Sequence, residues 1–406
     1  MDADANDGIG QSKRVELRES TMNFHHVACL LVLSLFAMPP AMAHDLPTPA
    51  EIDAEARAVM QRTQAKGLAL AVVDRGRPVS VQAWGVRNGK DEPLETDTVM
   101  YGASLTKAVF AYTVMKLVDE GRMTLDAPLS TMLPKPLPDY ADEATKDRYA
   151  DWSALDPRWR ALTPRILLAH GGGFANFGFL EPDGKLAIHF DPGTRYAYSG
   201  DGLITLQFAM TTGLGIDLGA ETDRVFRELG MPRTSLAWRA DFAGNLADGW
   251  TAEGAIEPHD ERSRVRVAGS MDTTIADFAR FAAAFVRGDG LSRQARKALV
   301  HAQLPITTRT QFPTLQAELA PAERRPDLAA GLGVVVFRGP QGAGFYKGGH
   351  NDSTGNTWVC IEKKQRCVVI LSNDVRAEAG FPRLVSFVLG ETGVPYDWEY
   401  GPLRSP

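Results

Sequence analysis

The chain has 406 residues, of which 44% are hydrophobic and 23% are charged, and its formal net charge at pH 7 is −6. These proportions are ordinary for a globular protein with a large core, and a chain of this length usually divides its core between two subdomains. The acidic balance provides no basic footprint, so we expect no nucleic-acid partner.

The N-terminal region has the pattern of an export signal. An apolar run over residues 27–38 is followed by Pro39-Pro40-Ala41-Met42-Ala43. An apolar core of this length before Ala-x-Ala is typical of a secretory signal and is too short to span a bilayer comfortably. We predict a signal peptide over residues 1–43, with Met22 as a possible true start, and a mature protein over 44–406. The mature protein is expected in the periplasm or outside the cell, without a stable membrane span.

The mature chain opens with a helix and two strands. Thr48-Pro49-Ala50-Glu51 is a capping box with proline at the first helical position, and it predicts a helix that runs to Lys66. Two apolar runs follow, at residues 68–73 and 78–86, and the tight turn Asp74-Arg75-Gly76 joins them. We predict two strands there.

The segment Tyr101–Glu120 is predicted to be an amphipathic helix, read at about 100° per residue. Lys107 falls near the centre of the apolar arc, and Ser104 lies at its edge one turn earlier. A buried lysine is costly unless it is neutral or paired, and a lysine of lowered pKa can activate a nearby serine. The alternatives are a serine that only caps the helix and a lysine that reaches water. The residues predicted on the polar side are Thr106, Tyr112, Thr113, Lys116, Asp119 and Glu120.

The rest of the chain predicts short helical pieces followed by a return to regular structure. Residues 123–268 are rich in proline and glycine and show little strand pattern. The later predicted elements are helices at 275–286 and 381–389 and strands at 332–337, 344–347, 357–361 and 367–371. We therefore predict an α+β fold, an antiparallel β-sheet flanked by helices. Its α/β part covers about 44–122 and 269–406, and a mainly helical second subdomain is inserted at about 123–268.

Two cysteines remain after removal of the signal, Cys360 and Cys367, on either side of a polar turn between two predicted strands. An exported protein folds in an oxidising compartment. We predict a disulfide across this hairpin, and the alternative is two free thiols.

Two further stretches are candidates for a site. Tyr198 lies in the turn-rich segment Pro192–Gly200, where a phenol can relay protons to and from a leaving group; most tyrosines in such loops simply pack. Lys347-Gly348-Gly349-His350 follows a predicted strand. Glycines there let a substrate approach the backbone closely, and a lysine adds a positive wall. The alternative is a strand that runs out into a glycine turn.

Together these motifs resemble the serine β-lactamase and penicillin-binding-protein superfamily, most closely its class C β-lactamase, esterase and D-aminopeptidase branch. The resemblance covers residues 50 to 390. The motifs are Ser104-x-x-Lys107, Tyr198-Ser199-Gly200 after Pro192-Gly193-Thr194, and Lys347-Gly348-Gly349, with similar stretches at Ala83–Gly85, Leu117–Asp126, Leu162–His170 and Met271–Phe281.

The resemblance implies a two-step acyl transfer without a cofactor or metal. Ser104 would attack a carbonyl, Lys107 would take its proton, and Tyr198 would help to protonate the leaving group. The backbone N–H groups of Ser104 and His350 would form the oxyanion hole, and Lys347 would hold the electrostatics of the site. The partner would be a small-molecule or peptide acyl substrate.

The chain departs from the family pattern at two positions. The second motif usually ends in asparagine, which contacts the lysine and the substrate amide, and here it ends in Gly200. Gly348 in the third motif cannot donate a hydrogen bond to a substrate carboxylate. A site that lacks such donors loses discrimination. We therefore favour an ester, amide or D-amino-acid peptide substrate over a β-lactam.

Several alternatives remain open from the sequence. A true class C-like β-lactamase and a non-catalytic binding protein on the same fold are both compatible with the motifs. His170-Gly171-Gly172-Gly173 resembles a lipase oxyanion loop, but the chain has no Gly-x-Ser-x-Gly. A metallohydrolase is disfavoured because the histidines show no His-Glu-x-x-His spacing.

Overall fold

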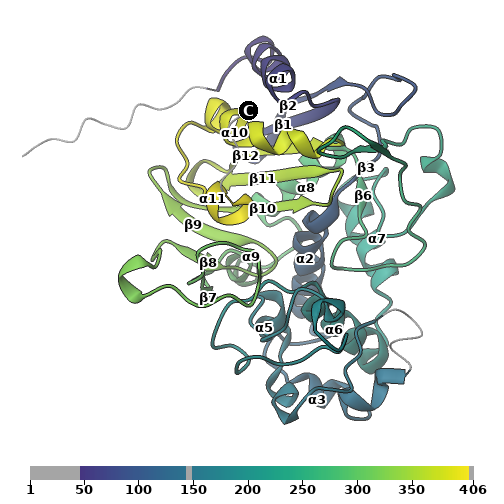
Figure 1. The fold of residues 1–406 in the computed structure, drawn as a ribbon, viewed down its shortest axis with the longest axis vertical. Coiled ribbons are helices and arrows are strands. Elements are labelled where there is room, and N and C mark those ends of the chain that lie inside the picture. The colour runs from purple at the N-terminus through teal and green to yellow at the C-terminus, as the bar shows by residue number, and fades with distance from the viewer. Residues whose placement is uncertain (1–45, 143–148, 402–406) are drawn as a thin grey trace, which may run out of the picture. The chain divides into compact units, whose positions relative to one another are not determined.

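Figure 1 shows a computed structural model of the chain, which describes residues 46–142 and 149–401. The predicted signal peptide, residues 1–43, and the alternative start Met22 lie outside the described residues. Within the described ranges, no single helix has the length and apolar character needed to cross a membrane, and one bent helix pair meets the test by length and composition only.

The core element is an eight-stranded sheet in which every neighbouring pair of strands is antiparallel. Its strand order is β2-β1-β12-β11-β10-β9-β8-β7. The predicted antiparallel sheet is therefore confirmed, and Figure 1 shows the first strands of the chain lying beside the last. The strands are β1 (Gly67–Asp74), β2 (Arg77–Gly85), β7 (Leu304–Pro305), β8 (Leu328–Ala330), β9 (Val335–Gly339), β10 (Gly342–His350), β11 (Gly355–Ile361) and β12 (Arg366–Ser372).

Helices cover both faces of the sheet. Alternate residues of a strand point to opposite faces, and each set packs against different helices. In β1, Leu68, Leu70 and Val72 belong to one hydrophobic cluster, whereas the alternate residues of the strand belong to another. Successive side chains of a strand point to opposite faces, so both faces of this strand are buried. The helices α1 (Pro49–Thr63) and α10 (Phe381–Leu389) share the first cluster, and α2 (Thr106–Asp119) and α8 (Ile275–Arg287) share the second.

Most predicted elements are present, with differences at the ends of elements and in the shortest ones. The capping box at Thr48 is formed, but α1 ends at Thr63 because Gln64 takes a left-handed conformation. The predicted strand 332–337 is wrong at its start: Gly333 has a φ of 71° and β9 begins only at Val335. The sequence analysis did not predict the short strands β7 and β8 or the helices α9 (Arg293–Leu299) and α11 (Tyr396–Tyr400), since elements this short carry no clear periodicity.

The predicted polar side of α2 is wrong for all but the end of the helix, where Asp119 is exposed. Thr106, Tyr112 and Thr113, predicted on a polar outer side, are fully buried. Their hydroxyls donate to backbone carbonyls, as in the 3.0 Å bond from Thr113 to Val109. The helix is therefore buried on all sides from Thr106 to Leu117, because α7 (Leu218–Glu228), α8 and α9 pack against it.

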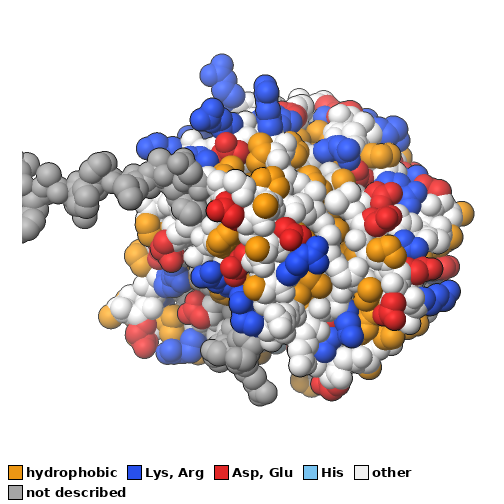
Figure 2. Space-filling model, turned by 90° about the horizontal axis from the view of Figure 1, so that it is seen from above, with side chains coloured by type: hydrophobic (Ala, Val, Ile, Leu, Met, Phe, Trp, Pro, Cys, Tyr) orange, Lys and Arg blue, Asp and Glu red, His pale blue; other side chains and the backbone are white. Residues whose placement is uncertain are grey.

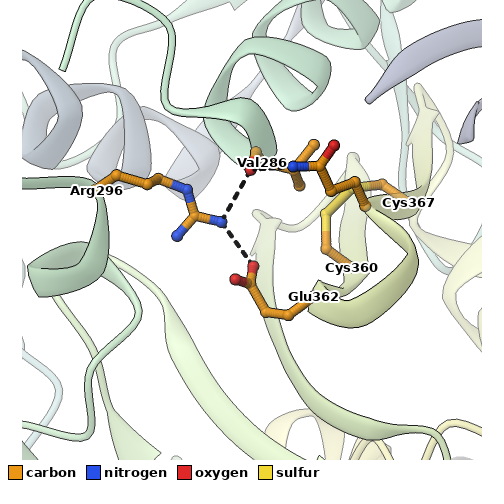
Figure 3. Close-up of a disulfide and its surroundings, with 6 residues drawn as sticks. Val286, Arg296, Cys360, Glu362 and Cys367 are labelled. Carbon is orange, nitrogen blue, oxygen red and sulfur yellow. Dashed lines mark hydrogen bonds and ion pairs between the residues drawn. A yellow bond between two sulfur atoms is a disulfide. The ribbon is translucent and has the colours of Figure 1, made fainter. Parts of the chain in front are cut away.

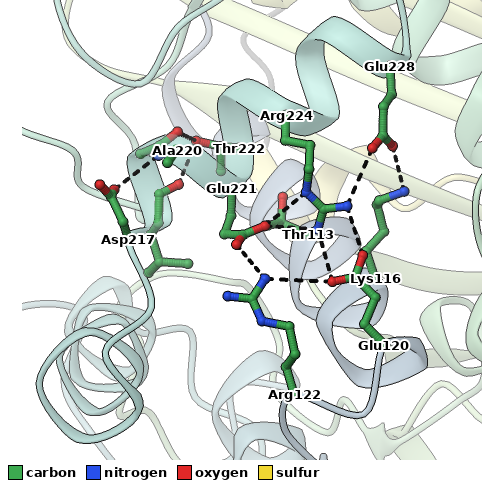
Figure 4. Close-up of polar contacts among 12 residues, drawn as sticks. Thr113, Lys116, Glu120, Arg122, Asp217, Ala220, Glu221, Thr222, Arg224 and Glu228 are labelled. Atoms are coloured by element: carbon green, nitrogen blue, oxygen red, sulfur yellow. Dashed lines mark hydrogen bonds and ion pairs between the residues drawn. The ribbon is translucent and has the colours of Figure 1, made fainter.

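Short helices make up most of the regular structure between residues 123 and 268: α3 (Leu129–Met132), α5 (Pro164–Leu168), α6 (Gly200–Phe208), continued by a π-helical turn over Ala209–Gly213, and α7 (Leu218–Glu228). Figure 4 shows the charged network that joins α7 to the end of α2. Lys116 pairs with Glu228 at 2.6 Å, and Arg224 bridges Glu120 and Glu221, each at 2.8 Å.

The predicted disulfide between Cys360 and Cys367 is confirmed, and it joins directly paired residues of β11 and β12 (Figure 3). Beside it, Arg296 of α9 donates to the Glu362 carboxylate at 2.6 Å and to the Val286 carbonyl at 3.4 Å. These contacts attach the end of the hairpin to α8 and α9. On the described surface that Figure 2 shows, basic and acidic side chains are interspersed.

The indole of Trp358 is the centre of the aromatic packing between the sheet and α8. It is fully buried, and the rings of Phe278, Phe281, Phe285 and Phe345 lie 5.0 to 5.7 Å from it. We predict that Trp358→Ala lowers the free energy of unfolding in urea by about 3–5 kcal/mol, because it leaves a cavity in a dense core.

Two variants act as controls for this prediction. Trp358→Phe should cost less, since it keeps an aromatic ring and removes an indole N–H that has no hydrogen-bond partner among the described residues. The exposed Val79→Ala should change the free energy of unfolding by less than about 0.5 kcal/mol. A loss below about 1 kcal/mol for Trp358→Ala would contradict the packing described here.

Candidate active site

Ser104 lies in a single 3-10 turn, Ala103–Leu105, directly before α2. The strand β3 (Met100–Tyr101) leads into this turn and pairs with β6 (Asp272–Thr273). Ala103 takes a left-handed conformation with a φ of 45°, which is strained for a residue with a Cβ. The Thr106 hydroxyl closes the turn by donating to the Ala103 carbonyl. The chain is thus held in an unfavourable backbone conformation beside the serine.

The amine of Lys107 lies 2.9 Å from the hydroxyl oxygen of Ser104. It also donates to the Ala268 carbonyl. The Lys107 side chain is only 1% exposed. Burial, with a smaller contribution from the positive charge of Lys347, holds the pKa of Lys107 well below its usual value. Because desolvation disfavours the ammonium form, this amine can accept a proton at a lower pH than an exposed lysine.

Tyr198 reaches the same serine from the segment before α6. Its phenol donates to the Ser104 hydroxyl oxygen at 2.8 Å, and its ring centroid lies 4.9 Å from the Lys107 amine and 5.2 Å from the Lys347 amine. Burial raises the pKa of Tyr198, so the phenol keeps its proton. In this arrangement the lysine is suited to accept a proton and the tyrosine to donate one.

His170 packs against Tyr198. It belongs to the segment His170–Gly173, which resembles a lipase oxyanion loop in sequence. Its ring lies 4.5 Å from the Tyr198 ring, and its Nδ1 accepts from the Ser199 backbone N–H at 3.1 Å. Its carbonyl accepts from the Ala197 backbone N–H at 2.9 Å. Burial, with the charges of Lys107 and Lys347, holds the pKa of His170 well below its usual value. The neutral imidazole therefore fixes the position of the tyrosine segment.

The third motif forms the end of β10. The strand β9 pairs with β10 over Gly342–Tyr346, and residues 347–350 continue beyond it along the cleft. A Cβ on Gly349 would lie 2.8 Å from the Ser104 backbone nitrogen and 2.9 Å from that of Leu105. Only glycine lets this strand pass so closely over the serine turn. Burial lowers the pKa of the neighbouring Lys347 to about 8.

His350 follows the glycines, and its side chain is engaged elsewhere. Its Nδ1 lies 3.1 Å from a carboxylate oxygen of Glu378. Burial alone would lower the pKa of His350, but the hydrogen bond and charge of Glu378 raise it overall. The side chain is therefore held by a carboxylate, and its backbone belongs to the strand end that lines the cleft.

The structure gives a reason for glycine at position 200, where the family usually has asparagine. A Cβ on Gly200 would lie 2.6 Å from a ring carbon of Phe177, so no larger side chain fits unless that ring moves. The Gly200 backbone N–H donates to the side-chain oxygen of Asn176 at 2.9 Å. Both Asn176 and Phe177 line the cleft. The loop before residue 178 thus fills the space that an asparagine side chain at 200 would take.

A cleft of about 1080 Å³ opens in front of Ser104, Lys107, Tyr198 and the third motif. The sequence-predicted residues Ser104, Lys107, Tyr198, Lys347, Gly348, Gly349 and His350 all line it, and Gly200 lies behind Phe177. Sequence reasoning missed four residues that shape the site, because they belong to no motif with a fixed spacing: Ala268, Asn176, Phe177 and Glu399. No group of three or more metal-ligating side chains was found in the described part of the chain.

Comparison with known proteins identifies the family. The Beta-lactamase family model matches residues 52–385. A lovastatin esterase from Penicillium rubens is 30% identical over 136 residues, which are 32% of this chain and 33% of that protein. The match thus spans about a third of that relative.

Three solved structures share the fold. A penicillin-binding protein homologue from Pyrococcus abyssi, described as octameric, has a TM-score of 0.66 and 18% identity, covering 84% of this chain and 78% of that one. A D-alanine carboxypeptidase from Burkholderia cenocepacia has a TM-score of 0.63 and 17% identity, covering 84% and 98%. A mutant class C beta-lactamase has a TM-score of 0.65 and 15% identity, covering 85% and 99%. This chain therefore belongs to the beta-lactamase family and has the fold of the β-lactamases and transpeptidases.

Proposed function

We propose that this protein is an exported serine hydrolase that forms an acyl-enzyme on Ser104, with Lys107 as general base and Tyr198 in the proton relay. The observation that carries the proposal is the convergence of two groups on one hydroxyl. The Lys107 amine and the Tyr198 phenol lie 2.9 Å and 2.8 Å from the Ser104 oxygen. A nucleophile within hydrogen-bond reach of a base is the arrangement that covalent catalysis needs.

In the first step, the neutral amine of Lys107 accepts the hydroxyl proton while the Ser104 oxygen attacks the substrate carbonyl. The carbonyl oxygen becomes an oxyanion, which the backbone N–H groups of Ser104 and His350 would stabilise. Tyr198 gives its proton to the leaving group as the carbon–oxygen or carbon–nitrogen bond breaks, and it recovers a proton from the Lys107 ammonium. Water then attacks the acyl-enzyme, losing a proton to the relay, and the acid product leaves as Ser104 regains its own.

The lining of the cleft favours substrates with an apolar portion. Phe179 and Phe312 line the cleft, yet 75% and 37% of their surfaces are exposed. Exposed aromatic side chains at a cleft are typical of a binding surface. Together with the esterase and D-alanine carboxypeptidase among the similar proteins, this supports an ester, amide or D-amino-acid peptide substrate. A class C-like β-lactamase is the second candidate, supported by the fold neighbour of that class.

Export of the protein from the cytoplasm is part of the same proposal. The apolar run at residues 27–38 and the Ala-x-Ala that follows support export to the periplasm or the medium. The Cys360–Cys367 disulfide supports an oxidising compartment.

The proposed nucleophile is tested by activity-based labelling and turnover. The parent protein should react with a fluorophosphonate probe and hydrolyse 4-nitrophenyl butyrate, whereas Ser104→Ala should lose both, with turnover reduced by about a thousandfold or more. Ser130→Ala in α3 is the matched control, because Ser130 is not among the residues that line the cleft. Rapid nitrocefin cleavage without ester turnover would instead favour the β-lactamase, and no labelling of the parent would favour a non-catalytic binding protein.

The pH dependence of kcat/KM should be bell-shaped. Lys107 must be neutral to act as a base, so activity should rise with pH through its lowered pKa, well below the value of an exposed lysine. Lys347 must be charged, so activity should fall as pH passes about 8. In Lys347→Arg the charge persists, and the alkaline fall should move up by about two pH units or more. An acid limb near pH 10, or an alkaline limb unmoved by Lys347→Arg, would count against these roles.

Gly349→Ala tests the close approach of β10 to the serine turn. The new methyl group would meet the backbone nitrogens of Ser104 and Leu105, which cannot move as a flexible side chain can. We expect kcat/KM to fall by about a hundredfold, because a small shift of the reacting groups has an effect of this size. Gly202→Ala in α6, where the nearest atom would lie 3.4 Å away, should retain activity. Full activity of Gly349→Ala would show that the strand is not fixed against the turn.

A further inference from the structure

The short helix α11 brings a carboxylate to the third motif from the end of the described chain. Glu399 lines the cleft and is only 5% exposed. A Cβ on Gly348 would lie 1.9 Å from Oε1 of Glu399. The carboxylate therefore occupies the space that any side chain at position 348 would take.

One oxygen of this carboxylate, the buried Oε2, is left without a hydrogen-bond partner among the described residues. The nearby His350 is already bonded to Glu378. Burial raises the pKa of Glu399, and the charges of Lys347 and His350, together with a hydrogen bond from the Gly348 backbone, offset this only in part. A buried, unpaired oxygen costs free energy, so its presence at the cleft calls for a functional explanation.

Glu399 lies near the end of the cleft where the proposed mechanism places the leaving group of a substrate. It lies beside Gly348 on the part of β10 that continues along the cleft beyond β9, and its charge acts on both Lys347 and Tyr198. Tyr198 is the proton donor to the leaving group in the proposed mechanism. The leaving group therefore departs on the side of the cleft where Glu399 lies.

The charged side chains on this side of the cleft determine which leaving groups can bind there. Because Lys107 is neutral in the proposed mechanism, Lys347 is the cation that would attract an anion, whereas the Glu399 carboxylate beside it repels one at short range in a low-dielectric site. We infer that Glu399 is a specificity-determining residue that excludes substrates whose leaving group carries a carboxylate and favours neutral or cationic leaving groups. This inference rests on the proposed function, because it assigns the leaving-group side from the role of Tyr198.

The test uses three butyrate esters that differ only in the leaving group: phenyl, 3-carboxyphenyl and 3-(dimethylaminomethyl)phenyl. Each kcat/KM is divided by the rate of hydrolysis by hydroxide, so that intrinsic reactivity cancels. For the parent protein we expect the carboxylate ester to fall about tenfold or more below the phenyl ester, since like charges at this range cost more than 1.4 kcal/mol. The cationic ester should equal or exceed the phenyl ester.

Glu399→Gln removes the charge and keeps the shape, and it should narrow the ratio of phenyl to carboxylate ester to about threefold or less. Glu261→Gln is the matched control, because Glu261 also lines the cleft but is exposed to solvent, and it should leave the ratio unchanged. If Glu399→Gln does not fold, the order of the three esters with the parent protein still decides the question.

The outcomes separate the two proposals. Turnover of all three esters with equal normalised kcat/KM, or a ratio that Glu399→Gln does not change, would overturn the role of Glu399 and leave the hydrolase intact. Absence of turnover of any ester by the parent would overturn the proposed hydrolase, and the inference with it.

Discussion

The proposed chemistry of this protein depends on the burial of one amine beside one hydroxyl. Lys107 is enclosed by the core, and its nitrogen is hydrogen-bonded to the Ser104 oxygen and the Ala268 carbonyl. Desolvation is the largest cause of the fall in its pKa. Burial has the opposite effect on the pKa of Tyr198, which it raises, because a buried phenol keeps its proton. One physical effect thus separates an acceptor from a donor around a single oxygen.

The fold creates this enclosure by packing two sets of elements around α2. The helices α8 and α9, from the later part of the chain, and α7, from residues 123–268, all pack against α2. The serine turn before α2 is held by the β3–β6 pair and by the close passage of Gly349. His170 then fixes the Tyr198 segment from behind. The site is therefore assembled from segments far apart in the chain, and each is positioned by backbone contacts.

Much of the fold follows from local sequence patterns. The capping box at Thr48, the hairpin strands around Cys360 and Cys367, and the helix at 381–389 were all readable from periodicity and turn residues. The polar side assigned to α2 was wrong, because a helical wheel cannot show that a second layer covers that side. The strands β7 and β8 are too short to leave a pattern, and their pairing depends on the tertiary fold.

The candidate site was readable only in part, for a related reason. Motif spacing named Ser104, Lys107, Tyr198 and Lys347, whose side chains line one cleft, and their catalytic roles stay predictions. The missing side chains at Gly200 and Gly348 looked like simple losses in the sequence. In the structure Phe177 fills one space and the Glu399 carboxylate fills the other. Neither replacement has a fixed spacing from the motif it affects, so no motif could reveal it.

The titration of the Lys107 amine itself is the most direct measurement of the central claim. The Nζ or Cε resonance of Lys107, assigned by its absence in Lys107→Met, can be followed by NMR against pH in protein labelled at lysine. We predict a midpoint well below the 10.5 of an ordinary lysine. A midpoint at or above that value would show that the amine is charged at neutral pH and unable to act as the base for Ser104.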